Sequence, residues 1–274
     1  MKMFEKAFLY VLLGIGAVIS VYPLYFMLVT SLQPMTFIFE YPPKLWPAEP
    51  TLDNFVNAWK SQHFSLYALN SVIVTTASFA IIFALSSMLA FAYSRFVFLG
   101  KRTSFVLLMG TLVIPSLTLV IPQFLLIRDL GLFDSRWGLV LVYAAGGIPF
   151  TTFLMKGFFD SISRELDESV AIDGGGSFRL YASILLPLSK PVFVPATIFN
   201  ILVVWEEFPW ALTIINDPLK RTLPVALANF QGQYATQWGV VFAGALIAVV
   251  PIIVLFLLLQ RYFVSGLTSG AVKG

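Results

Sequence analysis

The sequence predicts an all-α integral membrane protein with six transmembrane helices. Of its 274 residues, 58% are hydrophobic and only 11% are charged, whereas about a quarter of the residues in a soluble domain are charged. A hydrocarbon core about 30 Å thick requires about 20 apolar helical residues, and several stretches of the chain meet that length. We treat residues 1–274 as a single transmembrane domain in contact with the lipid bilayer. The predicted spans are 9–32, 70–93, 104–127, 138–155, 191–215 and 239–260.

The first span follows Lys2 and Lys6 and continues as an apolar run to Leu32. A signal peptide has a shorter apolar region, of roughly 7–15 residues, so we expect this segment to remain as a membrane helix. The next four spans are separated by charged loops, and the last follows a polar loop at 216–238. Prolines occur inside several spans, where they remove a backbone donor and kink the helix. These prolines are Pro23, Pro115, Pro122, Pro149, Pro195 and Pro251.

Lysine and arginine determine the expected orientation, because cytoplasmic loops carry an excess of them. The N-terminus, the 94–103 loop, the 156–190 loop and the C-terminus hold 11 of the 17 basic residues. Both termini are therefore expected in the cytoplasm.

Composition also argues against several other classes of protein. The net charge of +3 is small, and no basic stripe indicates nucleic-acid binding. The chain has no cysteine, and its single histidine, His63, has no second candidate ligand beside it, so we expect no metal site. An intramembrane enzyme would need a nucleophile–base pair or metal ligands, and we therefore expect no enzymatic activity in this chain.

The most informative segment is a polar stretch, ESVAIDGGGSFRLYASILLP, that begins at Glu168 and ends at Pro187. We expect a helix over ELDESVAID, capped by Ser161 or Ser163. Glycines from Gly174 onward end it, because glycine accepts the left-handed backbone of a helix stop. A second short helix, FRLYASILL, follows. The segment predicts a helix–turn–helix within a cytoplasmic loop at 156–190, suited to docking in a partner.

This stretch resembles the EAA loop of the permeases of ATP-binding-cassette (ABC) importers, whose pattern places E, G, I, L and P at fixed offsets. The chain matches at Glu168, Gly174, Ile184, Leu186 and Pro187 and departs at Ser169, Val170 and Gly175, where alanines are usual. The resemblance implies the type I permease fold and a coupling loop that sits in a cleft of an ATPase subunit. The implied ATPase-coupling contacts are Glu168, Ala171, Asp173, Gly174 and Ser177.

Other segments are similar to maltose-type sugar permeases, including FAYSRFVFLGKR, IPSLTLVIP and the tail QRYFVSGLTSGAVKG. The tail resembles that of the smaller permease of such importers, which reaches between the two ATPases. It implies further coupling contacts at Gly270, Lys273 and Gly274. The resemblance also implies a second homologous permease, two ATPase subunits, an extracytoplasmic solute-binding protein and a bacterial or archaeal plasma membrane.

No phosphate-binding loop of the form G-x-x-x-x-G-K-[ST] occurs in the chain. ATP and Mg are therefore expected on the partner ATPases, and no cofactor is expected in this chain. The expected function is ATP-driven import of a sugar or oligosaccharide by alternating access. The alternative is a secondary transporter or channel, which usually relies on buried charges for ion coupling. The sequence does not specify the sugar.

Two glutamates in VVWEEFPWAL interrupt the predicted fifth span. Glu206 lies roughly 22 Å along a helix that begins near Pro191, at about 1.5 Å per residue. Carboxylates and indoles can bind sugars, so Trp205, Glu206 and Glu207 are candidates for the substrate path. In the alternative interpretation the helix ends early and both glutamates lie in the wet interface, with tryptophans as interfacial anchors. The 216–238 loop is either a contact for the binding protein or a passive connector.

Overall fold

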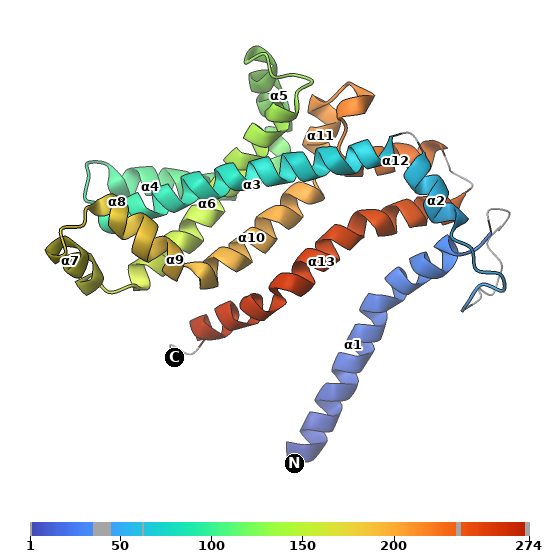
Figure 1. Ribbon diagram of the computed structural model, residues 1–274, viewed down its shortest axis with the longest axis horizontal. Helices are drawn as coiled ribbons and strands as arrows, with labels where there is room; N and C mark the ends of the chain where they lie inside the picture. The colour runs from blue at the N-terminus through green and yellow to red at the C-terminus, as the bar shows by residue number, and fades with distance from the viewer. Residues whose placement is uncertain (1, 35–44, 62, 234–236, 272–274) are drawn as a thin grey trace. The chain divides into compact units, whose positions relative to one another are not determined.

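The computed structural model describes residues 2–34, 45–61, 63–233 and 237–271, and within these ranges all regular structure is helical. The all-α class predicted from the sequence is therefore confirmed. The elements in chain order (Figure 1) are α1 (Lys2–Ser31), α2 (Asp53–Lys60), α3 (Phe64–Arg95), α4 (Lys101–Gly110), η1 (Thr111–Val113), η2 (Ser116–Leu119), α5 (Val120–Asp129), α6 (Arg136–Ser161), α7 (Glu165–Ile172), α8 (Ser177–Arg179), η3 (Leu180–Leu185), α9 (Leu186–Leu188), α10 (Lys190–Trp205), α11 (Pro209–Ile214), η4 (Pro218–Lys220), α12 (Leu223–Gln233) and α13 (Trp238–Ala271).

Long apolar helices account for most of the predicted spans. Over the described residues, α1, α3, α6 and α13 are each long and apolar enough to cross a bilayer. Two further pairs of helices, each bent at a short break, raise the count to six if each pair forms one span. Helices α3, α6 and α13 extend beyond the predicted bounds of 70–93, 138–155 and 239–260 at both ends, whereas α1 begins before the predicted 9–32 and ends one residue short of it.

The third predicted span, 104–127, is not one helix. It is bent by 101° between Lys101–Val113 and Ser116–Asp129. The break lies at Ile114 and Pro115, whose ψ angles are both 122°. Proline disfavours the α conformation in the residue before it and offers no N–H to continue the helix. The kink expected from Pro115 is thus a full break, with α4 on one side and α5 on the other.

The fifth predicted span, 191–215, also differs. Helix α10 ends at Trp205, and the separate short helix α11 begins at Pro209. At its other end α10 meets α8–α9 at a 75° bend across Ser189. The early end of α10 agrees with the alternative interpretation of the two glutamates, in which the helix stops before them.

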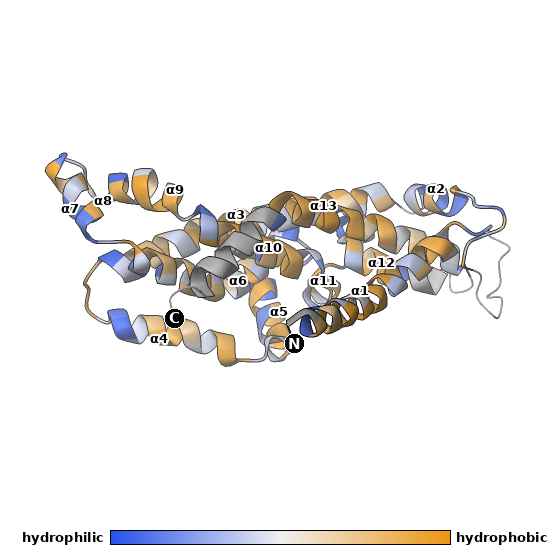
Figure 2. Cartoon of the chain, turned by 90° about the horizontal axis from the view of Figure 1, so that it is seen from below, coloured by the Kyte–Doolittle hydropathy of each residue, from blue (hydrophilic) through white to orange (hydrophobic). Residues whose placement is uncertain are grey.

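The chain divides into two compact units. The first comprises Met1–Ala68 and Val225–Ile252. In it, the buried Asn54 amide of α2 donates to the carbonyl oxygens of Ser31 (2.9 Å) and Gln33 (2.6 Å), which fixes the end of α1. Gly239 of α13 packs against the same amide, where a Cβ would lie only 2.5 Å from Asn54 Nδ2. No residue in the most apolar stretch of α1 is buried, so this helix presents its apolar side chains outward (Figure 2).

The second unit comprises Leu69–Pro224 and Ile253–Gly274, and its core forms where α3, α6 and α10 meet. A Cβ on Gly147 of α6 would lie 2.5 Å from Ile82 Cδ1 of α3 and 2.6 Å from Asn200 Oδ1 of α10. The buried Asn200 amide donates to Thr151 Oγ1 at 2.8 Å. Glycine at this crossing therefore allows three helices to approach closely, which gives the unit a rigid centre from which its two ends project.

Candidate functional site

The first candidate site is the segment from Ile162 to Leu188, which we call the α7–α9 loop. Arg164, and neither Ser161 nor Ser163, occupies the N-cap position of α7. Ser163 Oγ accepts a hydrogen bond from the Glu165 N–H at 3.2 Å just before the helix. Gly174 has φ of +73°. Its N–H donates to Ala171 O at 3.0 Å, and the next N–H, of Gly175, donates to Val170 O at 2.8 Å. This pair of bonds is the Schellman helix stop, which explains the glycine at position 174.

The second half of the loop differs in detail from the expected short helix. Ser177 is the first residue of α8, and Gly176 occupies the cap position before it. The helical path continues through the π-helical segment η3 and passes Pro187 to end at Leu188. The second helix therefore begins one residue before the expected FRLYASILL, at Ser177.

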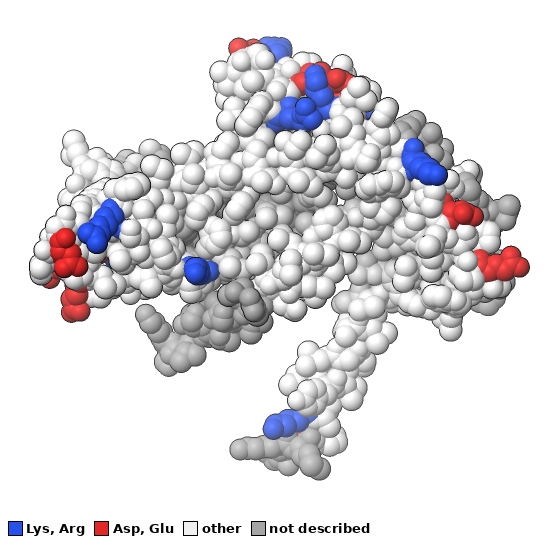
Figure 3. Space-filling model, in the orientation of Figure 1, with Lys and Arg blue, Asp and Glu red and all other residues white. Residues whose placement is uncertain are grey.

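The turn of the α7–α9 loop is an exposed surface. Two large apolar side chains flank it, Ile172 at 86% exposure and Phe178 at 79%. Acidic side chains of the first turn of α7 lie beside it, and Figure 3 shows charged groups gathered over this end of the unit. Exposed apolar residues beside a charged rim are typical of a protein-interaction surface. All five predicted coupling residues here are exposed, namely Glu168, Ala171, Asp173, Gly174 and Ser177.

The base of the loop, by contrast, is packed into the core of the unit. Leu185 is 0% exposed and Leu180 is 7% exposed, and both pack with Phe91 of α3 and with Met155 and Phe159 of α6. The Tyr181 hydroxyl and Ser87 Oγ of α3 form a hydrogen bond at 2.7 Å. Close-packed side chains and a hydrogen bond therefore join the base of the loop to α3 and α6.

An ion pair joins α7 directly to the end of α3. Arg95 Nε lies 3.0 Å from Asp167 Oδ2, and the Arg95 side chain is only 4% exposed. The same guanidinium donates through Nη2 to Ile162 O at 3.1 Å. Arg164 donates in turn to Ser94 O at 3.2 Å. Two arginines thus connect the last residues of α3 with both sides of the entry to α7.

The predicted tail contacts cannot be placed in the same way. Gly270 lies in the last turns of α13, and Lys273 and Gly274 lie outside the described residues. The three coupling roles assigned to the tail stay predictions.

The second candidate site is the junction of α10 and α11, where the two glutamates have different environments. Glu207 is half-buried and accepts hydrogen bonds from the N–H groups of Trp210 (2.9 Å) and Ala211 (3.1 Å) and from the Tyr143 hydroxyl. It therefore caps α11 and joins it to α6. Glu206 is exposed, and Trp205 is buried at 8% exposure.

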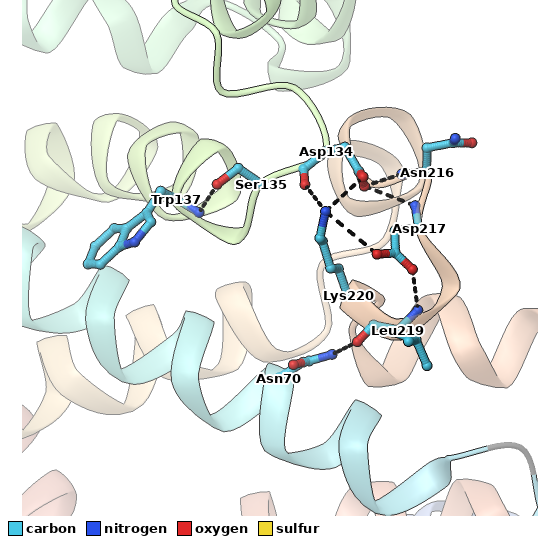
Figure 4. Close-up of polar contacts among 8 residues, drawn as sticks. All are labelled: Asn70, Asp134, Ser135, Trp137, Asn216, Asp217, Leu219 and Lys220. Carbon is cyan, nitrogen blue, oxygen red and sulfur yellow. Dashed lines mark hydrogen bonds and ion pairs between the residues drawn. The ribbon is translucent and has the colours of Figure 1, made fainter.

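A third polar cluster joins the loop before α6 to the loop after α11 (Figure 4). Asp134 has φ of +56°, and its Oδ1 accepts from the N–H groups of Asn216 (3.0 Å) and Asp217 (2.9 Å). Lys220 Nζ lies 2.9 Å from Asp134 Oδ2 and 3.6 Å from Asp217 Oδ2. Beside it, Asn70 of α3 donates to Leu219 O at 2.9 Å. These bonds hold the 214–221 segment in one conformation.

The same contacts perturb the protonation of both charged partners. The Asp217 N–H and then the Lys220 side chain stabilise the ionised carboxylate, which lowers the pKa of Asp134. The hydrogen bond to Asp134 raises the pKa of Lys220 above its ordinary value. Both groups are therefore held in their charged forms at neutral pH.

Sequence reasoning did not single out the side chains that organise these sites. Arg95 entered only as part of the 94–103 loop and the FAYSRFVFLGKR segment, and Asp134 belongs to none of the segments singled out in the sequence. A signal for Arg95 was available, since it is the last residue of a long apolar helix. Its partner, Asp167, is 72 residues away, and only the tertiary structure brings the two together.

The fold and its sites define a class of protein, a multi-span membrane component with a loop whose base is packed and whose turn is exposed. Residues 82–269 match the model of the binding-protein-dependent transport system inner membrane component family. The chain belongs to this family.

Individual relatives agree over nearly the whole chain. It is 41% identical to a probable ABC transporter permease protein, YurM, of Bacillus subtilis (strain 168), with 92% of this chain and 84% of that protein covered. It is 35% identical to the diacetylchitobiose uptake system permease protein DasC of Streptomyces coelicolor, with 93% and 92% covered.

A solved structure of a bacterial ABC transporter involved in the import of alginate has the same fold as this chain. Its matching chain superposes with a TM-score of 0.83 at 24% sequence identity, covering 96% of this chain and 97% of that one. The type I permease fold implied by the sequence is therefore confirmed.

Proposed function

We propose that this chain is a permease subunit of an ATP-driven ABC importer for a sugar or oligosaccharide, and that it works by alternating access. Relatives over most of the chain are named as permeases for diacetylchitobiose, for melibiose, raffinose and stachyose, and for maltodextrin. These names share one chemical class, the oligosaccharides, and differ in the individual sugar.

The observation that carries the proposal is the construction of the α7–α9 loop. Its turn exposes Ile172 and Phe178, whereas its base is buried against α3 and α6. A docking element that transmits force needs both properties, because a partner must grip the exposed part and the membrane helices must follow the buried part. We propose that an ATPase subunit binds this turn, with Glu168, Ala171, Asp173, Gly174 and Ser177 as its contacts.

The remaining assembly follows from this assignment. The partners are two ATPase subunits, which carry ATP and Mg, a second homologous permease and a solute-binding protein outside the membrane. The turn and both termini lie in the cytoplasm of a bacterial or archaeal cell, with the chain in the plasma membrane. Gly270, Lys273 and Gly274 of the tail reach the ATPases.

The opposite end of the second unit is suited to receive substrate. The Asp134–Lys220 cluster holds the 214–221 segment rigidly, as a surface for the binding protein requires. Because Glu207 caps α11 and Trp205 is buried, Glu206 is the carboxylate of this group that we place on the substrate path. A secondary transporter would rely on a buried charge such as Glu207 for ion coupling. The carboxylate oxygens of Glu207 already accept hydrogen bonds from two backbone N–H groups and from the Tyr143 hydroxyl, which disfavours that alternative.

Substitution of Ile172 by aspartate tests the docking role. The side chain is 86% exposed, so the change leaves the fold intact. Burying an isoleucine in an interface contributes about 1.5–3 kcal/mol, so we expect the affinity for the ATPase to fall by at least about tenfold. Leu219→Asp is the matched control, because Leu219 is an exposed apolar residue at the other end of the unit.

The readout is co-purification with the ATPase, together with sugar uptake by reconstituted vesicles. We expect Ile172→Asp to lose both and Leu219→Asp to retain the ATPase. Equal retention of the ATPase by wild type and Ile172→Asp would contradict the docking role. Uptake by the purified chain without any ATPase would favour the secondary-transporter alternative.

A further inference from the structure

An open surface cavity of about 520 Å³ lies at the connection between α3 and α4, apart from the sites described above. The 97–103 segment forms one side of it, and Tyr93, Phe105 and Lys156 complete the lining. Figure 2 shows that α4 begins with hydrophilic residues and continues with apolar ones. The cavity thus combines polar and apolar walls at the start of a membrane helix.

The charges on this lining have one sign. Lys101, Arg102 and Lys156 line the cavity, and none of its lining residues is acidic. Lys156 is partly neutralised, because its Nζ lies 2.5 Å from Asp160 Oδ2. Lys101 Nζ donates to the Phe96 carbonyl at 2.8 Å. The exposed Arg102 and the partly buried Lys101 therefore leave the cavity positive, which favours an anionic occupant.

The position of the cavity identifies which anion would meet it. Helix α3 is a candidate span that ends at Arg95, and α4 starts the next bent pair at Lys101. A five-residue connection between two membrane-crossing segments lies at the surface of the bilayer. Its two outermost side chains, Val97 at 96% and Leu99 at 104% exposure, are large and apolar. Such side chains are stable at this depth when they enter the acyl region of the lipid.

We propose that this cavity is a binding site for the headgroup of an anionic phospholipid. Arg102 and Lys101 contact the phosphate, and the acyl chains lie along Val97 and Leu99. Basic pockets beside membrane helices on the cytoplasmic side bind such headgroups through the same chemistry. The proposal is independent of the ATPase-docking role, because it uses neither the turn nor the substrate path.

The test measures lipid retained by the full chain. The chain is purified in detergent, incubated with equal amounts of phosphatidylglycerol and phosphatidylcholine, and analysed by native mass spectrometry. The variants are Arg102→Gln and the double substitution Lys101→Gln/Arg102→Gln. Lys190→Gln is the matched control, because Lys190 is an exposed lysine at the start of α10 that does not line the cavity.

We expect the wild type to retain phosphatidylglycerol in preference to phosphatidylcholine. Each basic charge removed reduces retention about fivefold, equivalent to about 1 kcal/mol per charge near a membrane surface, and Lys190→Gln behaves as wild type. Val97→Ser/Leu99→Ser reduces the retention of phosphatidylglycerol without altering any charge. Arg102 is exposed, whereas Lys101 is partly buried. If the double variant fails to fold, the single variant Arg102→Gln therefore still tests the proposal.

Three results would overturn the proposal. The first is equal retention of phosphatidylglycerol by wild type and Arg102→Gln. The second is equal retention of the two lipids by the wild type. The third is complete displacement of phosphatidylglycerol by millimolar inorganic phosphate with no effect of Val97→Ser/Leu99→Ser, since that would indicate a general anion site instead of a lipid site.

Discussion

Arg95 connects the end of α3 to α7, and replacing it with glutamine tests whether this ion pair holds the α7–α9 loop in place. The change removes the contact of 3.0 Å with Asp167 and leaves that carboxylate in a site where its side chain is only 22% exposed. It also removes the 3.1 Å hydrogen bond to Ile162 O at the entry to the loop. The substitution therefore weakens the attachment of both Ile162, which leads into α7, and Asp167 in the first turn of α7.

The magnitude follows from the burial of the two partners. Breaking a fully buried ion pair by removing one partner costs about 3–5 kcal/mol. Because Asp167 retains partial contact with solvent, we place the cost at about 2 kcal/mol. The nonpolar packing of Leu180 and Leu185 is unaffected, so we expect the loss to appear as local opening of α7 and not as global unfolding. A loss of about 2 kcal/mol corresponds to about a 30-fold increase in the population of the open state.

Hydrogen–deuterium exchange of the purified chain measures this opening directly. We expect the amides of α7 to exchange about 30-fold faster in Arg95→Gln, while those in the centre of α6 exchange at the wild-type rate. In the assembled importer, we expect ATP hydrolysis to continue with reduced sugar uptake per ATP, since a loosely held loop transmits less movement to α3. Arg128→Gln is the control, because its ion pair with Asp129 is exposed and contributes little.

The double substitution Arg95→Gln/Asp167→Asn separates the ion pair from other effects. It leaves no unpaired charge, so we expect exchange in α7 to return most of the way to the wild-type rate. Unchanged exchange in Arg95→Gln would refute the anchoring role. If the double variant exchanges as fast as the single one, the cost does not arise from the unpaired carboxylate.

Three further predictions concern the other sites. A Cβ on Gly175 would lie 2.6 Å from Val170 Cγ1, so Gly175→Ala should destabilise the loop by about 1–2 kcal/mol. In the same hydrogen-exchange measurement, the double variant Val170→Ala/Gly175→Ala should recover part of this loss. Equal exchange in the single and the double variant would contradict the steric explanation. Because the pKa of Asp134 is lowered in the folded chain, its contribution to stability is full above the unfolded pKa of about 3.9 and disappears as pH falls through the lower folded value. Thermal unfolding from pH 6 to pH 3 should therefore show a smaller pH dependence in Asp134→Asn, and identical profiles would exclude the effect. Glu207→Gln weakens the α11 cap, so it should lower the free energy of unfolding by about 1 kcal/mol and with it the unfolding temperature. Glu206→Gln should change the free energy of unfolding by less than about 0.5 kcal/mol but alter sugar uptake. Uptake by Glu206→Gln at the wild-type rate and affinity would remove Glu206 from the substrate path.

The Gly175 prediction explains a departure from the family pattern. The pattern has alanines at positions 170 and 175, and this chain has valine and glycine. A Cβ at position 175 would lie 2.6 Å from Val170 Cγ1 and 2.9 Å from the Val170 carbonyl oxygen. Both the valine side chain and the backbone of this turn therefore favour glycine at position 175.

Most of the fold could be predicted because the bilayer imposes a simple rule on the sequence. A run of about 20 apolar residues has few alternatives to a membrane helix, and fixed offsets around Gly174 indicated the helix–turn–helix. The breaks near Pro115 and at Trp205 could not be predicted with the same certainty. Proline is tolerated in many membrane helices, and whether the chain bends or breaks depends on which neighbouring groups accept the freed backbone.

The sequence by itself determined the class of the protein, its apolar helices and the position of the exposed turn after α7, because these depend on local composition and spacing. Only the tertiary structure decided how the turn is held and which glutamate is available. Arg95 meets Asp167, and Tyr143 meets Glu207, across long separations in sequence. Such contacts are products of helix packing, and packing depends on the shapes of all the facing side chains at once.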